Sequence, residues 1–231
     1  MDYSIRSCQT ELLDMPNIPA VDIHRNMYEL EIINRRLGGH AITLRGFSKL
    51  LKLKSKNQID VCEIGCGGGD NLKVIENSFT GKDVVLSFTG IDINPDCIRV
   101  AENIKWRSKI RLLISDYKKI HFEVKPDIIF CSLFCHHFKE AELIEMFRWM
   151  HDNANYGFFI NDLHRHPMAY HSIRFLTSLF SRSYLVKNDA PISVLRGFKK
   201  KELNDLLQRA GIVHYTIEWK WAFRWLVIAS R

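Results

Sequence analysis

Residues 58–70 read Gln-Ile-Asp-Val-Cys-Glu-Ile-Gly-Cys-Gly-Gly-Gly-Asp, a short apolar segment that runs directly into a glycine-rich turn. The apolar half predicts a buried strand over residues 59–64. Glycine occupies four of the five positions from 65 to 69, and it has no Cβ to keep a ligand away from the backbone. A tight turn without a ligand is the plainer alternative. An acid-bearing strand followed by so many glycines favours a ligand-binding turn at the start of a helix.

Two acidic residues flank this turn and indicate the charge of the ligand. Glu63 lies on the strand just before the glycines, and Asp70 stands where a dinucleotide-binding fingerprint carries a small residue. Two carboxylates at the turn favour a ligand with positive charge and without phosphates there. S-adenosylmethionine, with its sulfonium and ammonium groups, is a ligand of this kind.

The segment Glu-Ile-Gly-Cys-Gly-Gly-Gly-Asp at 63–70 resembles the first motif of class I S-adenosylmethionine-dependent methyltransferases, written E/D-x-G-x-G-x-G. The resemblance implies an enzyme that binds S-adenosyl-L-methionine and releases S-adenosyl-L-homocysteine. Within this motif it implies that the cofactor contacts are Glu63, Gly65, Cys66, Gly67 and Asp70.

A second acidic position follows the next predicted strand, residues 84–91. Asp92 ends this strand, where nucleoside-binding α/β sheets place a carboxylate that accepts hydrogen bonds from ribose hydroxyls. We therefore expect Asp92 to bind the ribose. The alternative is that Asp92 only caps the helix that begins near Pro95.

The resemblance extends the cofactor site to residues after the second, third and fourth strands. Ile93 corresponds to the apolar residue that lies against adenine in the family. Asp116, after the predicted strand 110–114, corresponds to the acid that binds the adenine amino group, unless it is an ordinary turn residue. Tyr117 and Ser132 complete the expected cofactor site.

The segment Ser-Leu-Phe-Cys-His-His-Phe at 132–138 follows the predicted fourth strand, residues 127–131. It resembles the post-strand motif of small-molecule methyltransferases of ubiquinone and menaquinone biosynthesis. A phenol has a pKa of about 10, so a neutral histidine would help to remove its proton near pH 7. We rank His137 and His164 first as the general base, followed by His136 and His166. A purely structural role is the alternative for each histidine.

Soft metal ligands also gather in this region, at Cys131, Cys135, His136 and His137. Three observations argue against zinc. Cys131 should point from a strand into the core, adjacent histidine side chains should diverge, and no second ligand pair has finger-like spacing. The sequence therefore predicts no metal.

Strands and helices alternate along the chain, which predicts a single α/β domain with a doubly wound, mostly parallel sheet. The family resemblance implies seven strands in the order 3-2-1-4-5-7-6, with the last strand antiparallel. We divide the domain into an N-terminal helical cap (1–56), a cofactor-binding core (57–161), a helical lid insertion (162–198), and a C-terminal helix and hairpin (199–231). Expected helices are 21–37, 40–53, 69–79, 95–104, 139–151 and 199–210, with the later strands at 156–161, 213–218 and 223–229.

The insertion at 162–198 is too long for an ordinary connection of about 2–6 residues. Apolar residues recur at helical spacing within 168–185, so we expect a helical lid over the crevice at the strand ends, although this face could simply pack on the sheet. Three residues are candidates for substrate contacts: His40 after the Gly-Gly break, Tyr170, and Arg196 for an anionic group.

Residues 164–201 contain eight Lys or Arg and one acid, Asp189, so this region carries a surplus of positive charge. The surplus could meet an anionic substrate, an acidic carrier protein, a peripheral membrane surface, nucleic acid or only solvent. Nucleic acid is disfavoured because the fourth strand lacks the Asp/Asn-Pro-Pro-Tyr/Phe motif of base methyltransferases, and no DNA- or RNA-binding signature is evident.

The 231-residue chain is 46% hydrophobic, which is normal for a globular protein. It has no apolar run of the roughly 18 residues needed to span a membrane, and its first residues lack a signal-peptide core. Six cysteines without a C-x-x-C pair indicate reduced thiols in a cytoplasmic protein.

Three further segments, 33–40, 161–167 and 193–198, resemble bacterial methyltransferases of phenolic-lipid, polyketide and quinone pathways. We therefore expect O-methylation of a small phenolic or quinol-like hydroxyl. The alternatives are C-methylation of a quinol-like ring, a nucleic acid methyltransferase, and a non-catalytic S-adenosylmethionine-binding module.

Overall fold

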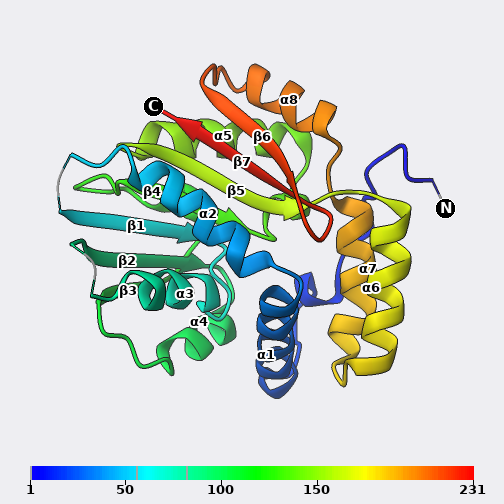
Figure 1. The fold of residues 1–231 in the computed structure, drawn as a ribbon. Coiled ribbons are helices and arrows are strands. Elements are labelled where there is room, and N and C mark those ends of the chain that lie inside the picture. The colour runs from blue at the N-terminus through cyan, green and yellow to red at the C-terminus, as the bar shows by residue number, and fades with distance from the viewer. Residues whose placement is uncertain (1, 56, 82) are drawn as a thin grey trace.

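A seven-stranded sheet runs through the molecule, with helices on both faces (Figure 1). The computed structural model describes residues 2–55, 57–81 and 83–231. The strands lie in the order β3-β2-β1-β4-β5-β7-β6. Neighbouring strands are parallel except that β7 runs antiparallel to both β5 and β6. The predicted sheet, its order and its antiparallel last strand are confirmed. The strands are β1 (Gln58–Ile64), β2 (Val85–Asp92), β3 (Lys109–Ile114), β4 (Ile128–Ser132), β5 (Gly157–Leu163), β6 (Tyr215–Lys220) and β7 (Arg224–Ser230).

Eight helices and three short 3-10 turns connect these strands in the described part of the chain. Their ends lie within a few residues of the expected ones; Gly38, in the Gly-Gly break, precedes α2, and Asn94 caps α4. The helices are α1 (Ala20–Arg36), α2 (Gly39–Leu51), α3 (Asp70–Phe79), α4 (Pro95–Glu102), α5 (Glu140–Asn153), α6 (Pro167–Phe180), α7 (Tyr184–Arg196) and α8 (Lys200–Arg209). The 3-10 turns are η1 (Leu12–Asp14), η2 (Tyr117–Lys119) and η3 (Cys135–His137).

The insertion contains two helices, α6 and α7, whereas the sequence predicted one helical stretch over 168–185. The helix is interrupted at residues 181–183. There Glu29 of α1 accepts hydrogen bonds from the Ser181 hydroxyl and from the backbone N–H groups of Arg182 and Ser183. The Ser183 side chain then caps α7. A partner more than 150 positions away decides this break, so helical periodicity did not reveal it.

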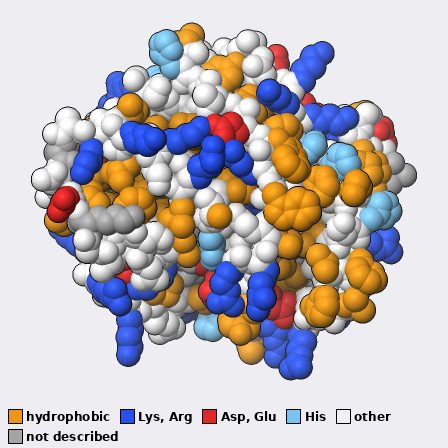
Figure 2. Space-filling model, in the orientation of Figure 1, with side chains coloured by type: hydrophobic (Ala, Val, Ile, Leu, Met, Phe, Trp, Pro, Cys, Tyr) orange, Lys and Arg blue, Asp and Glu red, His pale blue; other side chains and the backbone are white. Residues whose placement is uncertain are grey.

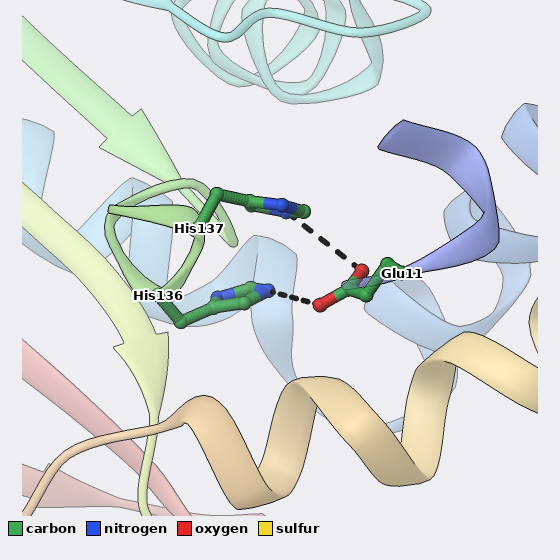
Figure 3. Close-up of side chains that lie close together, drawn as sticks. All are labelled: Glu11, His136 and His137. Atoms are coloured by element: carbon green, nitrogen blue, oxygen red, sulfur yellow. Dashed lines mark ion pairs between the residues drawn. The ribbon is translucent and has the colours of Figure 1, made fainter. Parts of the chain in front are cut away.

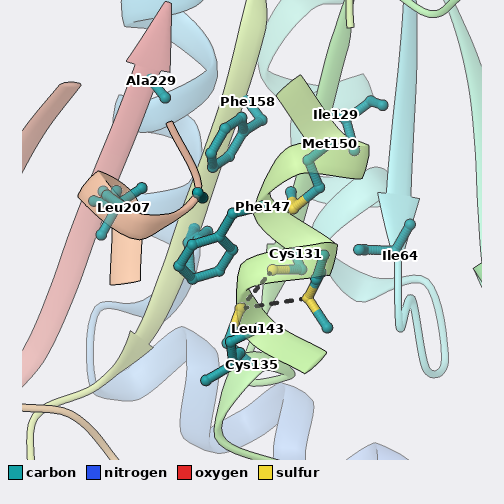
Figure 4. Close-up of a cluster of buried hydrophobic side chains, with 14 of the residues drawn as sticks. Ile64, Ile129, Cys131, Cys135, Leu143, Phe147, Met150, Phe158, Leu207 and Ala229 are labelled. Carbon is teal, nitrogen blue, oxygen red and sulfur yellow. Dashed lines mark hydrogen bonds between the residues drawn. The ribbon is translucent and has the colours of Figure 1, made fainter. Parts of the chain in front are cut away.

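Each face of the sheet carries its own apolar core. On one face, α5 and α8 pack Leu143, Phe147 and Leu207 against the strands (Figure 4). On the other face, α2 and α3 cover Phe130 and Phe159, whose rings stack with centroids 4.6 Å apart. Five cysteines are buried and free: Cys62, Cys66, Cys97, Cys131 and Cys135.

The carboxyl ends of the parallel strands point toward α1, α6 and α7, which stand together at this edge (Figure 1). This is the edge at which open α/β sheets bind ligands. Among the described residues, none of the helices has the length and apolar character required to cross a membrane.

The surface of the insertion is both apolar and basic. Exposed hydrophobic residues of α6 include Met168, Phe175 and Leu179, and Figure 2 shows hydrophobic side chains gathered on this side of the molecule. Two of the eight cations counted in this region are buried. Arg165 donates to both carboxylate oxygens of Glu202, and Arg196 is also inside. The other six are exposed: Arg174, Arg182, Lys187, Lys199, Lys200 and Lys201.

Candidate active site

A cavity of about 1490 Å³ opens at the carboxyl ends of β1, β2 and β4. Its floor is formed by the turns that follow these strands. Its other walls come from α1, from the segment before α1, from α6 and α7, and from the turn between β6 and β7. The expected lid helices and the N-terminal helix therefore do lie over the strand ends.

The turn after β1 contains positions at which only glycine fits well. Gly65, Gly67 and Gly69 have φ angles of +64°, +51° and +79°, in the left-handed region. A Cβ on Gly65 would come within 2.2 Å of the Phe134 ring. The turn thus packs closely beneath the segment that follows β4.

Asp92 is joined to this turn. The backbone N–H of Gly67 donates to Oδ2 of Asp92 and the N–H of Asn94 donates to Oδ1, both at 2.9 Å. Burial raises the pKa of Asp92, and these two hydrogen bonds oppose the shift. The N-cap of α4 is Asn94, whose side chain accepts from the N–H of Asp96. The alternative role of Asp92 as the helix cap is therefore wrong, and the carboxylate lines the cavity.

The two acids that flank the glycines occupy different environments. Glu63 is buried behind the turn and does not line the cavity. Its Oε1 accepts from the Asn71 amide at 3.2 Å, and its Oε2 has no hydrogen-bond partner within the described chain. Burial, together with the nearby Asp70, raises the pKa of Glu63. Asp70 lines the cavity and accepts from the Asn34 amide at 3.1 Å and from Nε2 of His40 at 2.8 Å.

Arg224, which the sequence analysis missed, provides a buried cation in the cavity wall. Its Nη2 donates to Oδ1 of Asn34 at 2.8 Å, so Asn34 connects Arg224 with Asp70. Burial lowers the pKa of Arg224 to about 10, while nearby acids oppose the shift. An arginine at the start of an otherwise apolar strand was the available signal.

Some expected cofactor contacts reach the cavity and others do not. Ser132 lines the cavity, and its Oγ is buried without a hydrogen-bond partner in the described chain. Asp116 instead caps η2 by accepting from the Lys118 N–H at 3.0 Å, and Tyr117 packs its ring against Trp149. Lining residues among those expected are Gly65, Cys66, Gly67, Asp70, Asp92, Ile93 and Ser132.

His136 and His137 also line the cavity, on η3 directly after β4. Their ring centroids are 4.5 Å apart, and both rings point toward Glu11 from the segment before α1 (Figure 3). The expectation that adjacent histidines diverge is therefore wrong, because the 3-10 turn brings both rings to one side. Nε2 of His136 lies 3.5 Å from Oε1 of Glu11, and Nε2 of His137 lies 3.8 Å from Oε2.

Each ring is held from its other nitrogen by a further carboxylate. Nδ1 of His136 donates to Oδ1 of Asp162 at 2.7 Å, and Nδ1 of His137 donates to Oδ2 of Asp14 at 3.1 Å. Burial alone would lower the pKa of His136, but Asp162 and Glu11 raise it to about 9. Sequence reasoning missed Glu11 and Asp14, whose only signal was a pair of acids in an apolar stretch.

Arg196 holds this turn from behind and does not line the cavity. Its Nε donates to the carbonyl of His136 at 3.0 Å and its Nη2 to that of His137 at 2.7 Å. Its Nη1 donates to Oδ2 of Asp14 at 3.3 Å. The structure therefore places Arg196 as a support for the histidine pair, away from the position expected for a substrate contact.

The remaining candidates lie outside the cavity wall. His164 accepts from the Trp219 indole at 3.2 Å, and His166 stacks on Phe223 with ring centroids 5.0 Å apart. Burial and the neighbouring His166 lower the pKa of His164 to about 4. His40 is buried against Asp70, and Tyr170 is buried beside Tyr3.

Comparisons with known proteins agree with this architecture. Residues 61–157 match a family model described as Methyltransferase domain. A search of curated proteins finds no match. The plantazolicin methyltransferase BpumL in complex with SAH is a similar solved structure, at 17% identity and a TM-score of 0.66, with 92% of this chain and 96% of that chain covered.

Two further structures show the same likeness. Magnesium protoporphyrin IX methyltransferase (ChlM) from Synechocystis PCC 6803 with bound SAM is 15% identical, with a TM-score of 0.59 over 93% of this chain and 92% of that one. Human N-acetylserotonin methyltransferase in complex with SAM is 15% identical, with a TM-score of 0.64 over 92% of this chain and 56% of that one.

At such low identity these structures establish the fold, and the family model identifies residues 61–157 as a methyltransferase domain, in agreement with the resemblance of the glycine motif. The solved relatives hold SAM or SAH, which agrees with the cofactor expected for this chain.

Proposed function

We propose that this protein transfers the methyl group of S-adenosylmethionine to a hydroxyl of a small, largely apolar molecule, with a phenol or quinol as the substrate class. One observation carries the proposal. The glycine turn with Asp92 and the histidine pair open onto the same cavity, so a bound cofactor and a substrate hydroxyl can meet there.

The residues around the glycine turn, the part of the cavity that we call the notch, fit the cofactor. Asp92 offers carboxylate oxygens to the ribose hydroxyls, and the glycine turn lets the ligand lie against the backbone. Asp70 and Arg224, linked through Asn34, present opposite charges that match the ammonium and carboxylate ends of an amino acid. Ser132 adds a buried hydroxyl that lacks a partner in the described chain. When bound, the cofactor supplies a methyl group activated by its sulfonium.

Apolar side chains of the insertion form the opposite wall and support an apolar substrate. These residues come from α6 and α7 and are Ala169, Ile173, Leu176, Val186 and Val194. Their position lets the insertion exclude water from the reacting groups and orient the acceptor. The solved relatives include plantazolicin, magnesium protoporphyrin IX and N-acetylserotonin methyltransferases, so structures of this fold serve different acceptors.

The acceptor hydroxyl is activated at the histidine pair, and we propose that it meets His137 first. The His137 side chain is partly exposed to the cavity, whereas that of His136 is almost fully buried. C-methylation of a quinol ring would use the same activation, since it also begins by removing a phenolic proton.

A labelled-methyl transfer screen tests the proposal. The protein is incubated with methyl-labelled S-adenosylmethionine and panels of phenols, quinols, fatty acyl compounds and RNA. We expect label in phenols or quinols, and fragmentation of the product by mass spectrometry separates oxygen from carbon methylation. Transfer to RNA alone, or binding of the cofactor without transfer to any panel, would contradict the proposed acceptor class.

A further inference from the structure

The distances from the Glu11 carboxylate to the two histidine rings are too long for hydrogen bonds. Glu11 is buried, and its Oε1 has no hydrogen-bond partner within the described chain. The nearest ring nitrogens are Nε2 of His136 at 3.5 Å and Nε2 of His137 at 3.8 Å. Hydrogen bonds between such atoms are about 2.7–3.2 Å long, so the carboxylate faces both rings across a gap.

The outer nitrogens of both rings are already used. Asp162 accepts from Nδ1 of His136 at 2.7 Å, and Asp14 accepts from Nδ1 of His137 at 3.1 Å. These bonds fix the Nδ1–H on each ring and leave Nε2 directed at Glu11. Metal-binding histidines are oriented in this way, by a carboxylate on the nitrogen that does not bind the metal.

The separations match those between ligands of one ion. Two ligands of a tetrahedral zinc ion, each about 2.0–2.1 Å from the metal, lie roughly 3.4 Å from one another. One ligand atom from each of Glu11, His136 and His137 lies within 4.8 Å of the others. A cation placed between them would need only small movements of the side chains.

We propose that Glu11, His136 and His137 bind a divalent transition-metal ion, with zinc as the best match, and that its open coordination position faces the cavity. Two imidazoles and one carboxylate with an open position form a common catalytic zinc site. All three residues line the cavity, so the open position lies beside the expected acceptor.

The charges around the pair also fit a cation. Glu11, Asp14 and Asp162 contact the two rings, and Arg196 approaches Glu11 and Asp14 at 3.7 and 3.3 Å. A bound ion would add positive charge between these carboxylates.

This set differs from the cysteine-containing set considered from the sequence. Cys131 and Cys135 are buried in the core with their sulfurs 3.3 Å apart, and Cys135 also contacts Met146 (Figure 4). Glu11 supplies the third ligand, from a segment more than 120 residues away in sequence.

The role of the ion rests on the proposed function. A hydroxyl placed against the open position would have a lower pKa, with its proton released to bulk water. Its oxygen would then attack the methyl carbon, and the C–S bond of the cofactor would break to leave a neutral thioether.

Zinc binding to the purified full chain tests the site without any activity assay. Isothermal titration with zinc should show one ion per chain. Cobalt should give the visible absorption bands of a tetrahedral site. We expect Glu11→Gln and His137→Gln to weaken binding at least tenfold, whereas Glu140→Gln, an exposed change on α5, should not. Circular dichroism identifies any variant that fails to fold. If one ligand variant is unfolded, zinc binding by the other ligand variant tests the site.

Absence of stoichiometric binding by the folded wild-type chain, or equal binding by both folded ligand variants, would overturn the site. Failure of the proposed function gives a different result, namely stoichiometric ion binding without methyl transfer to any acceptor. If the chelator-treated, metal-free chain transfers methyl groups at the full rate, the site loses its role in the reaction.

Discussion

The backbone N–H of Gly67 donates a 2.9 Å hydrogen bond to Oδ2 of Asp92 and so ties the glycine turn after β1 to the end of β2. The Asp92 carboxylate therefore has two functions in our account: it shapes the turn and it presents oxygens to the ribose. Both depend on its negative charge.

Asp92→Asn should weaken binding of S-adenosylmethionine at least about tenfold, since a hydrogen bond to a charged group contributes about 1.5–3 kcal/mol. Calorimetric titration with the cofactor measures the effect. Asp205→Asn, an exposed change on α8, is the matched control. Equal affinities of the wild type and the Asp92 variant would remove the ribose role.

Gly65→Ala should lower the free energy of unfolding more than Gly211→Ala does. Both glycines have φ in the left-handed region, at +64° and +79°, where an L-residue costs roughly 1–2 kcal/mol. Only at Gly65 would the new Cβ meet a neighbour, the Phe134 ring at 2.2 Å, whereas nothing lies within 4 Å at Gly211. Urea unfolding of the two variants gives the comparison, and similar losses would show that the turn can move away from Phe134.

His137→Ala should reduce turnover by at least about a hundredfold, because it removes a group that activates the acceptor hydroxyl, while cofactor affinity stays near the wild-type value. The ring lines the cavity, and its ion pairs are with Glu11 and Asp14. Initial rates and calorimetry separate the two effects. His214→Ala, on an exposed position before β6, is the control. Wild-type turnover in His137→Ala would exclude this residue from the reaction.

Acid should destabilise the fold through His164. Burial, followed by the nearby His166, lowers the pKa of His164 to about 4 from its usual 6.5. The folded state thus favours the neutral ring, so this contribution is complete above pH 6.5 and is lost as the pH falls toward 4. Partial exposure reduces it to the order of 1 kcal/mol. His164→Gln should reduce the pH dependence of the unfolding free energy between pH 6.5 and 4. An unchanged pH dependence would show that His164 is not its source.

The sequence revealed the sheet and the glycine turn because their signals are local. The apolar run over β1, the glycines at 65–69 and the Gly-Gly break at 38–39 each act within a few residues. The strand order came from the family resemblance, and the parallel pairings in the structure agree with it.

The histidine pair was visible in the sequence, but its surroundings were not. Asp14 is 123 positions from His137, and Glu11 is as remote, so no periodicity connects them. Arg196 was expected to face a substrate, yet its guanidinium donates to the carbonyls of the histidine turn. Side-chain direction of this kind depends on packing between distant elements.

The sequence also did not show which of the acids at the strand ends line the cavity, because side-chain direction depends on packing. Asp92 and Asp116 both follow strands, but only Asp92 lies in the cavity wall, since Asp116 turns to cap η2. Strand ends predict a shared edge of the sheet, whereas the rotation of each side chain at that edge requires the structure.

A crystal structure of the protein soaked with S-adenosylhomocysteine tests the central claim most directly. We predict ribose hydroxyls within hydrogen-bond distance of the Asp92 carboxylate, the nucleoside against the glycine turn, and the sulfur directed toward the His136–His137 side of the cavity. A notch that stays empty at saturating ligand, or a nucleoside bound away from Asp92, would contradict the account.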